Sequence, residues 1–158
     1  MPVEVRSSKE QSDALQRFFV RPFFLSLTIG IPFCAFKLVF GLSALRAGTS
    51  VLAGLGWIVV AWACADLAMN MGRSVYDLAG RAAPFEYCTI AQVGRMLGRP
   101  TVFLALDTLL SFAIICLMLW SGWIARLPEI ETYVWYAATT LNLISLSVVS
   151  LYNEIRKE

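Results

Sequence analysis

The sequence predicts an all-α integral membrane protein, a four-transmembrane-helix bundle with short amphipathic surface helices on the cytoplasmic side. Of its 158 residues, 58% are hydrophobic, and the mean hydropathy is +0.68. Soluble domains of this length are typically about half apolar. Four apolar runs are each long enough to cross a hydrocarbon core of roughly 30 Å. Basic residues also gather in alternate connections between these runs, as they do in polytopic membrane proteins.

The membrane domain is predicted over residues 23–152 and contains the four spans. These spans lie at about 23–45, 51–71, 101–124 and 132–152. Each has the length of a helix that rises 1.5 Å per residue through the bilayer.

Outside the spans we expect three cytoplasmic segments. Residues 1–22 form an N-terminal amphipathic arm that lies on the membrane surface, and residues 153–158 form a short charged tail. The loop 73–100 is the only sizeable connection. We expect Ser74 to Ala82 to continue the second helix and Pro84 to open a short surface helix.

The charge distribution predicts the orientation of the chain. Ten basic residues lie in the arm, the loop and the tail, whereas the two short turns hold only Arg46 and Arg126. Both termini and the loop are therefore predicted to be cytoplasmic, in a membrane of the bacterial inner type. Four tryptophans would then form an aromatic belt at the outer interface: Trp57, Trp120, Trp123 and Trp135.

Two features of the first two spans predict local geometry. Pro32 cannot donate a hydrogen bond to Thr28, so we expect a kink near Gly30. The second span carries small residues at intervals that would let another helix approach closely, namely Ala61, Ala65, Ala68 and Gly72.

A polar stripe begins inside the second span and continues beyond it. Its members recur every three or four residues, so they share one face if a single helix runs through them: Asp66, Asn70, Arg73, Asp77 and Arg81. Polar side chains inside an apolar segment need partners, so the stripe indicates buried polar packing or an ion path.

Several polar residues form a candidate intramembrane network: Lys37, Asp66, Asn70, Arg73, Asp107, Ser111 and Asn142. At 1.5 Å per residue, Asp66 and Asp107 lie about 7 Å and about 9 Å from the cytoplasmic side. By the same rise per residue, Lys37 lies about 12 Å from the outer end of its span. By this count the two aspartates share a layer of the bundle, and Lys37 is poorly placed to pair directly with either.

Three interpretations of these residues stay open. In the first, Asp66 bonds Asn70 or Arg73, Asp107 bonds Ser111 or a loop arginine, and Lys37 snorkels outward. In the second, the aspartates line a hydrated vestibule for protons or cations, and in the third an ionisable group contacts a partner subunit or a lipid headgroup. If the two carboxylates face each other, we expect one to hold a proton, or both to share a cation or an arginine, with Arg73 the nearest candidate. Asn142 is expected to form an interhelical hydrogen bond.

A second group of residues is expected to anchor the protein at the lipid interface. It consists of Arg17, Arg21, Arg95, Arg99, Trp120 and Trp123.

The composition also excludes several classes of function. There is no histidine, and the four cysteines form no C-x-x-C pair, so we expect no metal site, no cofactor and no enzymatic activity. The net charge of +2, without a basic patch, argues against nucleic acid as a partner.

Two functions remain as expectations. The first is a non-catalytic subunit of a larger membrane complex, whose partners are the lipid bilayer and other membrane subunits or copies of itself. The alternative is a homo-oligomeric channel or pore that conducts protons or cations past Asp66 and Asp107.

Overall fold

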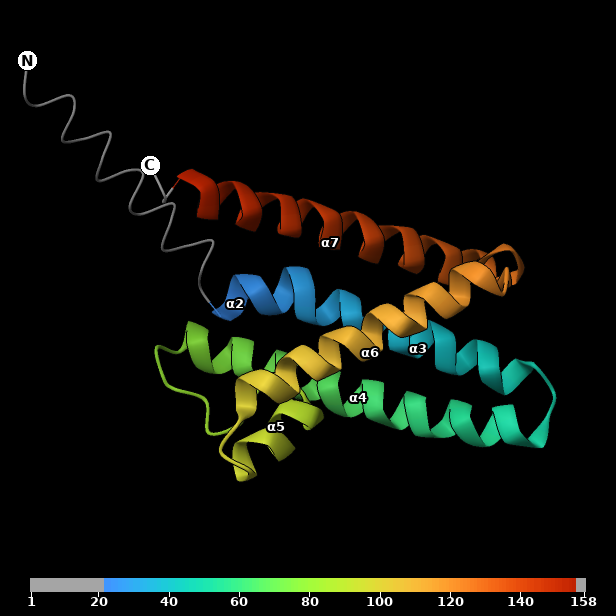
Figure 1. Ribbon diagram of the computed structural model, residues 1–158, viewed down its shortest axis with the longest axis horizontal. Coiled ribbons are helices and arrows are strands. Elements are labelled where there is room, and N and C mark those ends of the chain that lie inside the picture. Colours follow the sequence, from blue (N-terminus) through green and yellow to red (C-terminus); the bar gives the residue numbers. More distant parts are fainter. Residues whose placement is uncertain (1–21, 156–158) are drawn as a thin grey trace, which may run out of the picture.

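The computed structural model describes residues 22–155, and every regular element in that part of the chain is helical (Figure 1). The elements are α2 (Pro22–Leu25), the π-helical turn η1 (Ser26–Gly30), α3 (Ile31–Arg46), α4 (Ser50–Leu78), α5 (Thr89–Met96), α6 (Pro100–Trp120), the 3-10 turn η2 (Trp123–Arg126) and α7 (Glu129–Ile155). The predicted amphipathic helix in the N-terminal arm lies outside the described residues.

Four of the described helical segments are long and apolar enough to cross a membrane. They are Ser26–Arg46, Ser50–Leu78, Pro100–Trp120 and Glu129–Leu151. Each follows one of the predicted apolar runs, so the prediction of an all-helical fold with four such segments is confirmed for the described chain.

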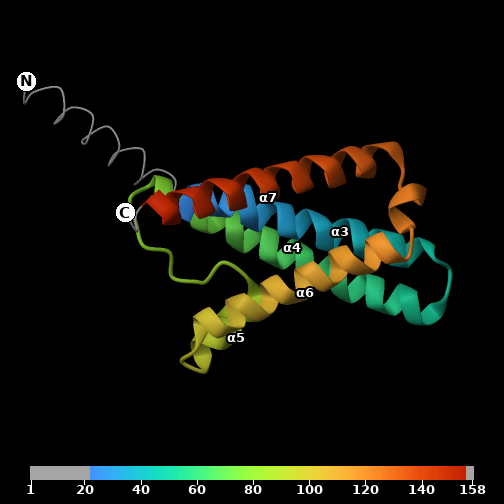
Figure 2. The same cartoon turned by 45° about the horizontal axis from the view of Figure 1, so that its top comes forward.

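Helix α3 is the centre of the arrangement. It packs against α4, α6 and α7, and Figure 2 shows these three helices disposed around it. In the most apolar 18-residue stretch of its segment, 56% is buried inside the protein. In the corresponding stretches of the other three long helices, 22% is buried. The interior of the fold is therefore built largely on the side chains of α3.

The two ends of the molecule differ (Figure 1). The start of α2, the α4–α5 connection, α5 and the last turns of α7 lie at one end, which we call the loop end. The two shorter connections, residues 47–49 and 121–128, lie at the other end, which we call the turn end. The longest connection of the described chain and α5 thus lie at the loop end.

Two glycines bring α3 and α4 into backbone contact. A Cβ added at Gly56 would lie 2.8 Å from the carbonyl oxygen of Gly41, and one added at Gly41 would lie 3.1 Å from that of Gly56. Such distances are too short for any other residue type without movement of a helix. The prediction that Ala61, Ala65 and Ala68 provide this close approach is wrong within the chain, because all three face outward.

Pro32 follows an irregular stretch of backbone, as predicted for the region of Gly30. The irregularity takes the form of the π-helical turn η1, which ends two residues before the proline. A π turn widens the helix by one residue, and such turns relieve the loss of hydrogen bonds near proline. It also leaves Ser26 and Thr28 facing inward, where both are buried.

Helix α4 continues well past Met71, as predicted, but ends at Leu78 rather than at Ala82. Gly80, at a φ of 67°, terminates it in the left-handed conformation that glycine adopts readily. Arg81 is consequently not on the helix, and Asp77 accepts a hydrogen bond from the backbone nitrogen of Phe23. The polar stripe on the helix therefore ends at Asp77, one member before the predicted Arg81.

The helix α5 begins later than predicted. Pro84 does not open it; instead Cys88 caps it, accepting a hydrogen bond from the backbone nitrogen of Ala91 at 3.4 Å. Residues 84–88 form an irregular segment that runs along α4.

An aromatic layer fills the fold toward the turn end. Its core contains Phe36, Phe40, Met118 and Trp135, and the rings of Phe36 and Trp135 meet edge to face at 4.8 Å. Trp135, which is 4% exposed, is thus a core residue and not a member of an exposed belt. Trp57 and Trp120 do face outward, with 67% and 88% of their surface exposed.

We predict that Gly56→Ala destabilises the fold and that Gly54→Ala does not. The new methyl group at position 56 would collide with the backbone of α3, which typically costs about 1–3 kcal/mol. Gly54 is the matched control, because a Cβ there meets nothing within 4 Å on the same helix. Thermal unfolding in detergent measures both, and equal melting temperatures for the two variants would contradict the close contact.

Candidate functional site

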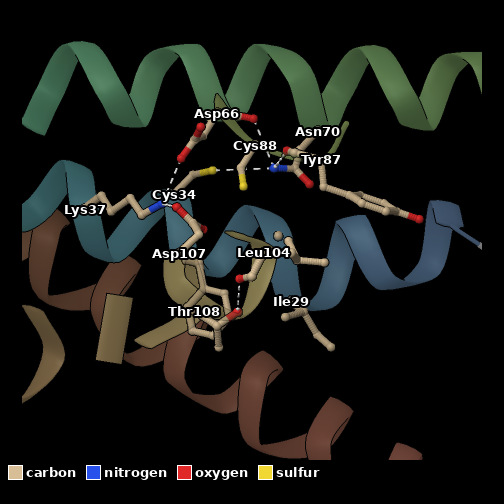
Figure 3. Close-up of a pocket in the computed structure, with 12 residues that line it drawn as sticks. Ile29, Cys34, Lys37, Asp66, Asn70, Tyr87, Cys88, Leu104, Asp107 and Thr108 are labelled. Atoms are coloured by element: carbon tan, nitrogen blue, oxygen red, sulfur yellow. Dashed lines mark hydrogen bonds and ion pairs between the residues drawn. The ribbon is translucent and has the colours of Figure 1, made fainter. Parts of the chain in front are cut away.

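A buried cluster of three charged side chains lies where α3, α4 and α6 meet. The Lys37 ammonium donates to Asp66 Oδ2 and to Asp107 Oδ1, at 2.7 Å in each case. Lys37 and Asp66 are each 1% exposed, and Asp107 is 5% exposed. We call these three residues the ionic cluster (Figure 3).

The prediction that Lys37 is poorly placed to pair directly with either aspartate is therefore wrong, and so is the interpretation in which Lys37 snorkels outward. The depth count placed the Cα atoms but left out the side chains. A lysine stem extends about 6 Å, and every side chain leans toward the N-terminus of its own helix. Because α3 and α4 are antiparallel, Lys37 and Asp66 lean toward each other along the bundle.

Two further contacts hold the ammonium in place. Its Nζ atom lies 4.0 Å from the centre of the Trp62 ring, a cation–π contact. Trp62 precedes Asp66 by four residues on α4, so both belong to one helix face. The lysine is thus enclosed by two carboxylates and an aromatic face, which compensates for its removal from water.

Asp66 also joins the cluster to the start of α5. Its Oδ1 accepts hydrogen bonds from the backbone nitrogen of Thr89 at 2.7 Å and from the Thr89 hydroxyl at 2.8 Å. With Lys37, three donors surround this carboxylate, so its charge is well compensated. The contact holds the first residue of α5 against α4.

Asn70, one turn along α4, connects the cluster with η1 and with the irregular segment. Its Nδ2 donates to the backbone oxygens of Asp66 and Tyr87 at 3.0 Å and 2.9 Å, and its Oδ1 accepts from the Ser26 hydroxyl at 3.0 Å. Gly30 allows this approach, because a Cβ at that position would lie 2.1 Å from Asn70 Oδ1.

Arg73 takes no part in the ionic cluster. Its Nη1 donates to the backbone oxygen of Phe85 at 2.7 Å, and its guanidinium lies 3.9 Å from the centre of the Tyr87 ring. Glu86 Oε2 lies 3.4 Å from Arg73 Nη1. The cation that the two aspartates share is therefore Lys37 and not the predicted Arg73, which instead fixes the irregular segment to α4.

The remaining network candidates lie outside the cluster. The Ser111 hydroxyl donates to the backbone oxygen of Asp107 at 2.9 Å, so it does not bind the carboxylate as predicted. Asn142 is buried on α7, but its Oδ1 has no hydrogen-bond donor among the described residues. The predicted interhelical hydrogen bond to that oxygen is thus not present in the described part of the chain.

The candidate interface residues occupy different positions. Arg95 is exposed and donates to the backbone oxygen of Pro84, Arg99 is exposed, and Trp123 stacks on Phe40 with ring centres 5.9 Å apart. Trp120 is the most exposed large side chain of α6. Arg17 and Arg21 lie outside the described residues.

A partly enclosed cavity of about 210 Å³ borders the ionic cluster (Figure 3). Its polar walls come from Lys37, Asp66, Asn70 and Asp107, and the rest is largely apolar, formed by Ile29, Gly30, Phe33, Cys34, Tyr87, Cys88, Leu104 and Thr108. Asp107 borders it with a carboxylate of which only Oδ1 is bonded to Lys37. The cavity therefore combines a largely apolar interior with one wall of net negative charge, formed by two carboxylates and an ammonium group.

The Cys88 thiol lies next to this wall. Burial, and to a smaller extent the two aspartates, raises the pKa of Cys88 to about 12. It is therefore a neutral thiol at physiological pH and only a weak hydrogen-bond donor.

The site contains residues that sequence reasoning missed. Tyr87 and Cys88 lie on the irregular segment, where no periodicity indicates which side chain faces inward, and Thr89 is the first residue of the short helix that follows it. Trp62 could have been found, because its spacing of four from Asp66 places both on one face of α4. Among the described residues, no group of three or more histidine, cysteine, aspartate or glutamate side chains could hold a metal ion.

We predict that substitutions in the cluster destabilise the protein in the order Lys37→Met, Asp66→Asn, Asp107→Asn. The first leaves two buried carboxylates without a cation, a loss typically of about 3–5 kcal/mol. The second also breaks the contacts with Thr89, whereas the third leaves one balanced ion pair between Lys37 and Asp66.

Unfolding in mixed micelles measures this order. Asp77→Asn, on the half-buried end of α4, is the control for loss of a carboxylate as such. An Asp107→Asn variant less stable than Lys37→Met would contradict the charge balance described above.

The chain was also compared with known proteins. It matches no model of a protein family, no curated protein and no solved structure. We therefore infer its function from its own residues and their geometry.

Proposed function

We propose that the chain is an integral membrane protein of the bacterial inner-membrane type, with both termini and the loop end in the cytoplasm. The four long apolar helices support insertion. The basic residues support the orientation: in the described chain, Arg73, Arg81, Arg95 and Arg99 lie toward the loop end, against Arg46 and Arg126 at the turn end.

Reporter fusions test this topology. A reporter placed after Glu158, or inserted near Ala83, is expected to read cytoplasmic, because basic connections are retained inside. A reporter inserted at Gly48 is expected to read outside. A C-terminal fusion that reads outside would contradict the proposed orientation.

We further propose that the protein acts as a non-catalytic subunit of a larger membrane complex. The observation that carries this proposal is the open arrangement around α3. Helices α4, α6 and α7 each pack on α3 and leave most of their surface exposed. Outside the long helices, the described chain provides only α2, α5, η2 and short connections, which offer little surface for action in water.

Two polar atoms on these open helices support association. Trp62 Nε1 on α4 and Asn142 Oδ1 on α7 are buried but have no hydrogen-bond partner among the described residues. A buried polar group without a partner costs about 1–3 kcal/mol. Shifts of the helices on assembly that bring these two atoms to new partners would recover this energy.

The mass of the solubilised protein tests the proposal. Extracted from its own membrane in mild detergent, the protein is expected to sediment with other chains in a fixed ratio. The same chain expressed alone in a foreign membrane is the control and should lack them. A native sample that contains only this chain, as a monomer or a whole multiple, would contradict the subunit proposal.

The ionic cluster favours the alternative, a homo-oligomeric channel for protons or cations, because buried ionisable groups often mark ion paths. The aromatic layer around Phe36 and Trp135 opposes it, since it closes the interior on the turn side of Lys37. If the protein is such a channel, liposomes that contain it must show a proton or cation flux. That flux must change in the Asp107→Asn variant and stay the same in Asp77→Asn. Wild-type liposomes without flux under any applied gradient would remove it.

A further inference from the structure

The cavity beside the ionic cluster has a charge that the described chain does not balance. Two carboxylates and one ammonium give a formal charge of −1, and all three groups are at least nine-tenths buried. Asp66 is enclosed by three donors. The uncompensated charge therefore falls on Asp107.

Asp107 Oδ2 is the atom that lacks a strong partner. Lys37 is bonded to Oδ1, and the neighbouring Cys88 thiol is only a weak donor. Asp107 lines the cavity, next to Leu104 and Thr108 (Figure 3). A molecule in the cavity thus meets a charged acceptor that still has hydrogen-bonding capacity.

The walls determine what else the molecule must be. Ile29, Phe33 and Leu104 present apolar surface, and the cavity of about 210 Å³ has room for more than benzene, which fills an apolar protein cavity of roughly 150 Å³. A hydrated metal ion would find too few oxygen ligands here. A lipid tail or an ether would offer Asp107 no donor, and an anion would be repelled.

We propose that this cavity binds a small organic ammonium ion with an apolar body, about one ring and a short chain in size. The ammonium group donates to Asp107 Oδ2, and the apolar body lies against Ile29, Phe33 and Leu104. This inference goes beyond the proposed subunit role, and it holds whether or not the chain conducts ions.

Calorimetric titration of the full-length protein in detergent tests the proposal, with empty micelles subtracted. The probe is 2-phenylethylammonium, and 2-phenylethanol and 3-phenylpropionate are its neutral and anionic counterparts. We expect saturable binding of the ammonium, at least tenfold weaker binding of the alcohol, and no binding of the carboxylate. No saturable signal above that of micelles, or equal binding of the ammonium and the alcohol, would overturn the proposal.

Two pairs of variants locate the site. Asp107→Asn should weaken binding at least tenfold, while Asp77→Asn should leave it within twofold. Leu104→Phe fills the cavity and should also weaken binding tenfold, whereas Leu109→Phe places the same side chain on the outer face of α6 and should not. Binding that survives Leu104→Phe, or that sodium ions displace at equal concentration, would overturn the assignment. Because Leu104→Phe leaves the ionic cluster intact, the site remains testable if Asp107→Asn unfolds.

Discussion

The burial of one ammonium group is the constraint on which much of this structure depends. An isolated lysine in a low-dielectric interior is costly by several kcal/mol, so Lys37 requires anionic partners within hydrogen-bond distance. Asp66 comes from α4 and Asp107 from α6, and α3 must therefore lie between these two helices. Asp66 in turn needs donors for its second oxygen, which Thr89 provides. A single buried charge thus fixes three helices and the start of α5.

The approach of the helices makes these contacts possible. Gly41 and Gly56 let α3 and α4 touch through their backbones, and Gly30 makes room for the Asn70 amide. The π-helical turn before Pro32 then directs Ser26 toward Asn70, where its hydroxyl also reaches the Asn70 carbonyl oxygen at 3.0 Å. Gly30 and the π-helical turn bring the polar groups of Asn70 and Ser26 within about 3 Å of their partners, the range in which a hydrogen bond compensates for lost hydration.

Much of the fold could be predicted from the sequence, because the length and hydropathy of a run directly reflect burial in an apolar environment. The ionic cluster could not, although all three of its residues were candidates. Their contact depends on how far Lys37 reaches and, for Asp66 on the antiparallel α4, on the opposite lean of the two side chains, which Cα depth does not contain. Thr89 was inaccessible for another reason: it follows an irregular segment that has no period from which an inward face can be read, and its helix was predicted to begin at Pro84. Asn70 and Arg73 share one helix face, yet Asn70 is hydrogen-bonded to the backbone of Asp66 in the cluster, whereas Arg73 holds the irregular segment.

The identity of the central cation also has a physical reason. Lysine carries a compact charge on a flexible stem, so one ammonium can lie between two carboxylates that come from different helices, with a third side against Trp62. The planar guanidinium of arginine favours a two-point contact with a single carboxylate and needs more space. It is therefore consistent that Arg73 lies at the edge of the interior, where the backbone oxygen of Phe85 and the Tyr87 ring suit its shape. The compact ammonium contacts only Oδ1 of Asp107. Oδ2 is therefore left without a strong hydrogen-bond donor on a carboxylate that borders the cavity.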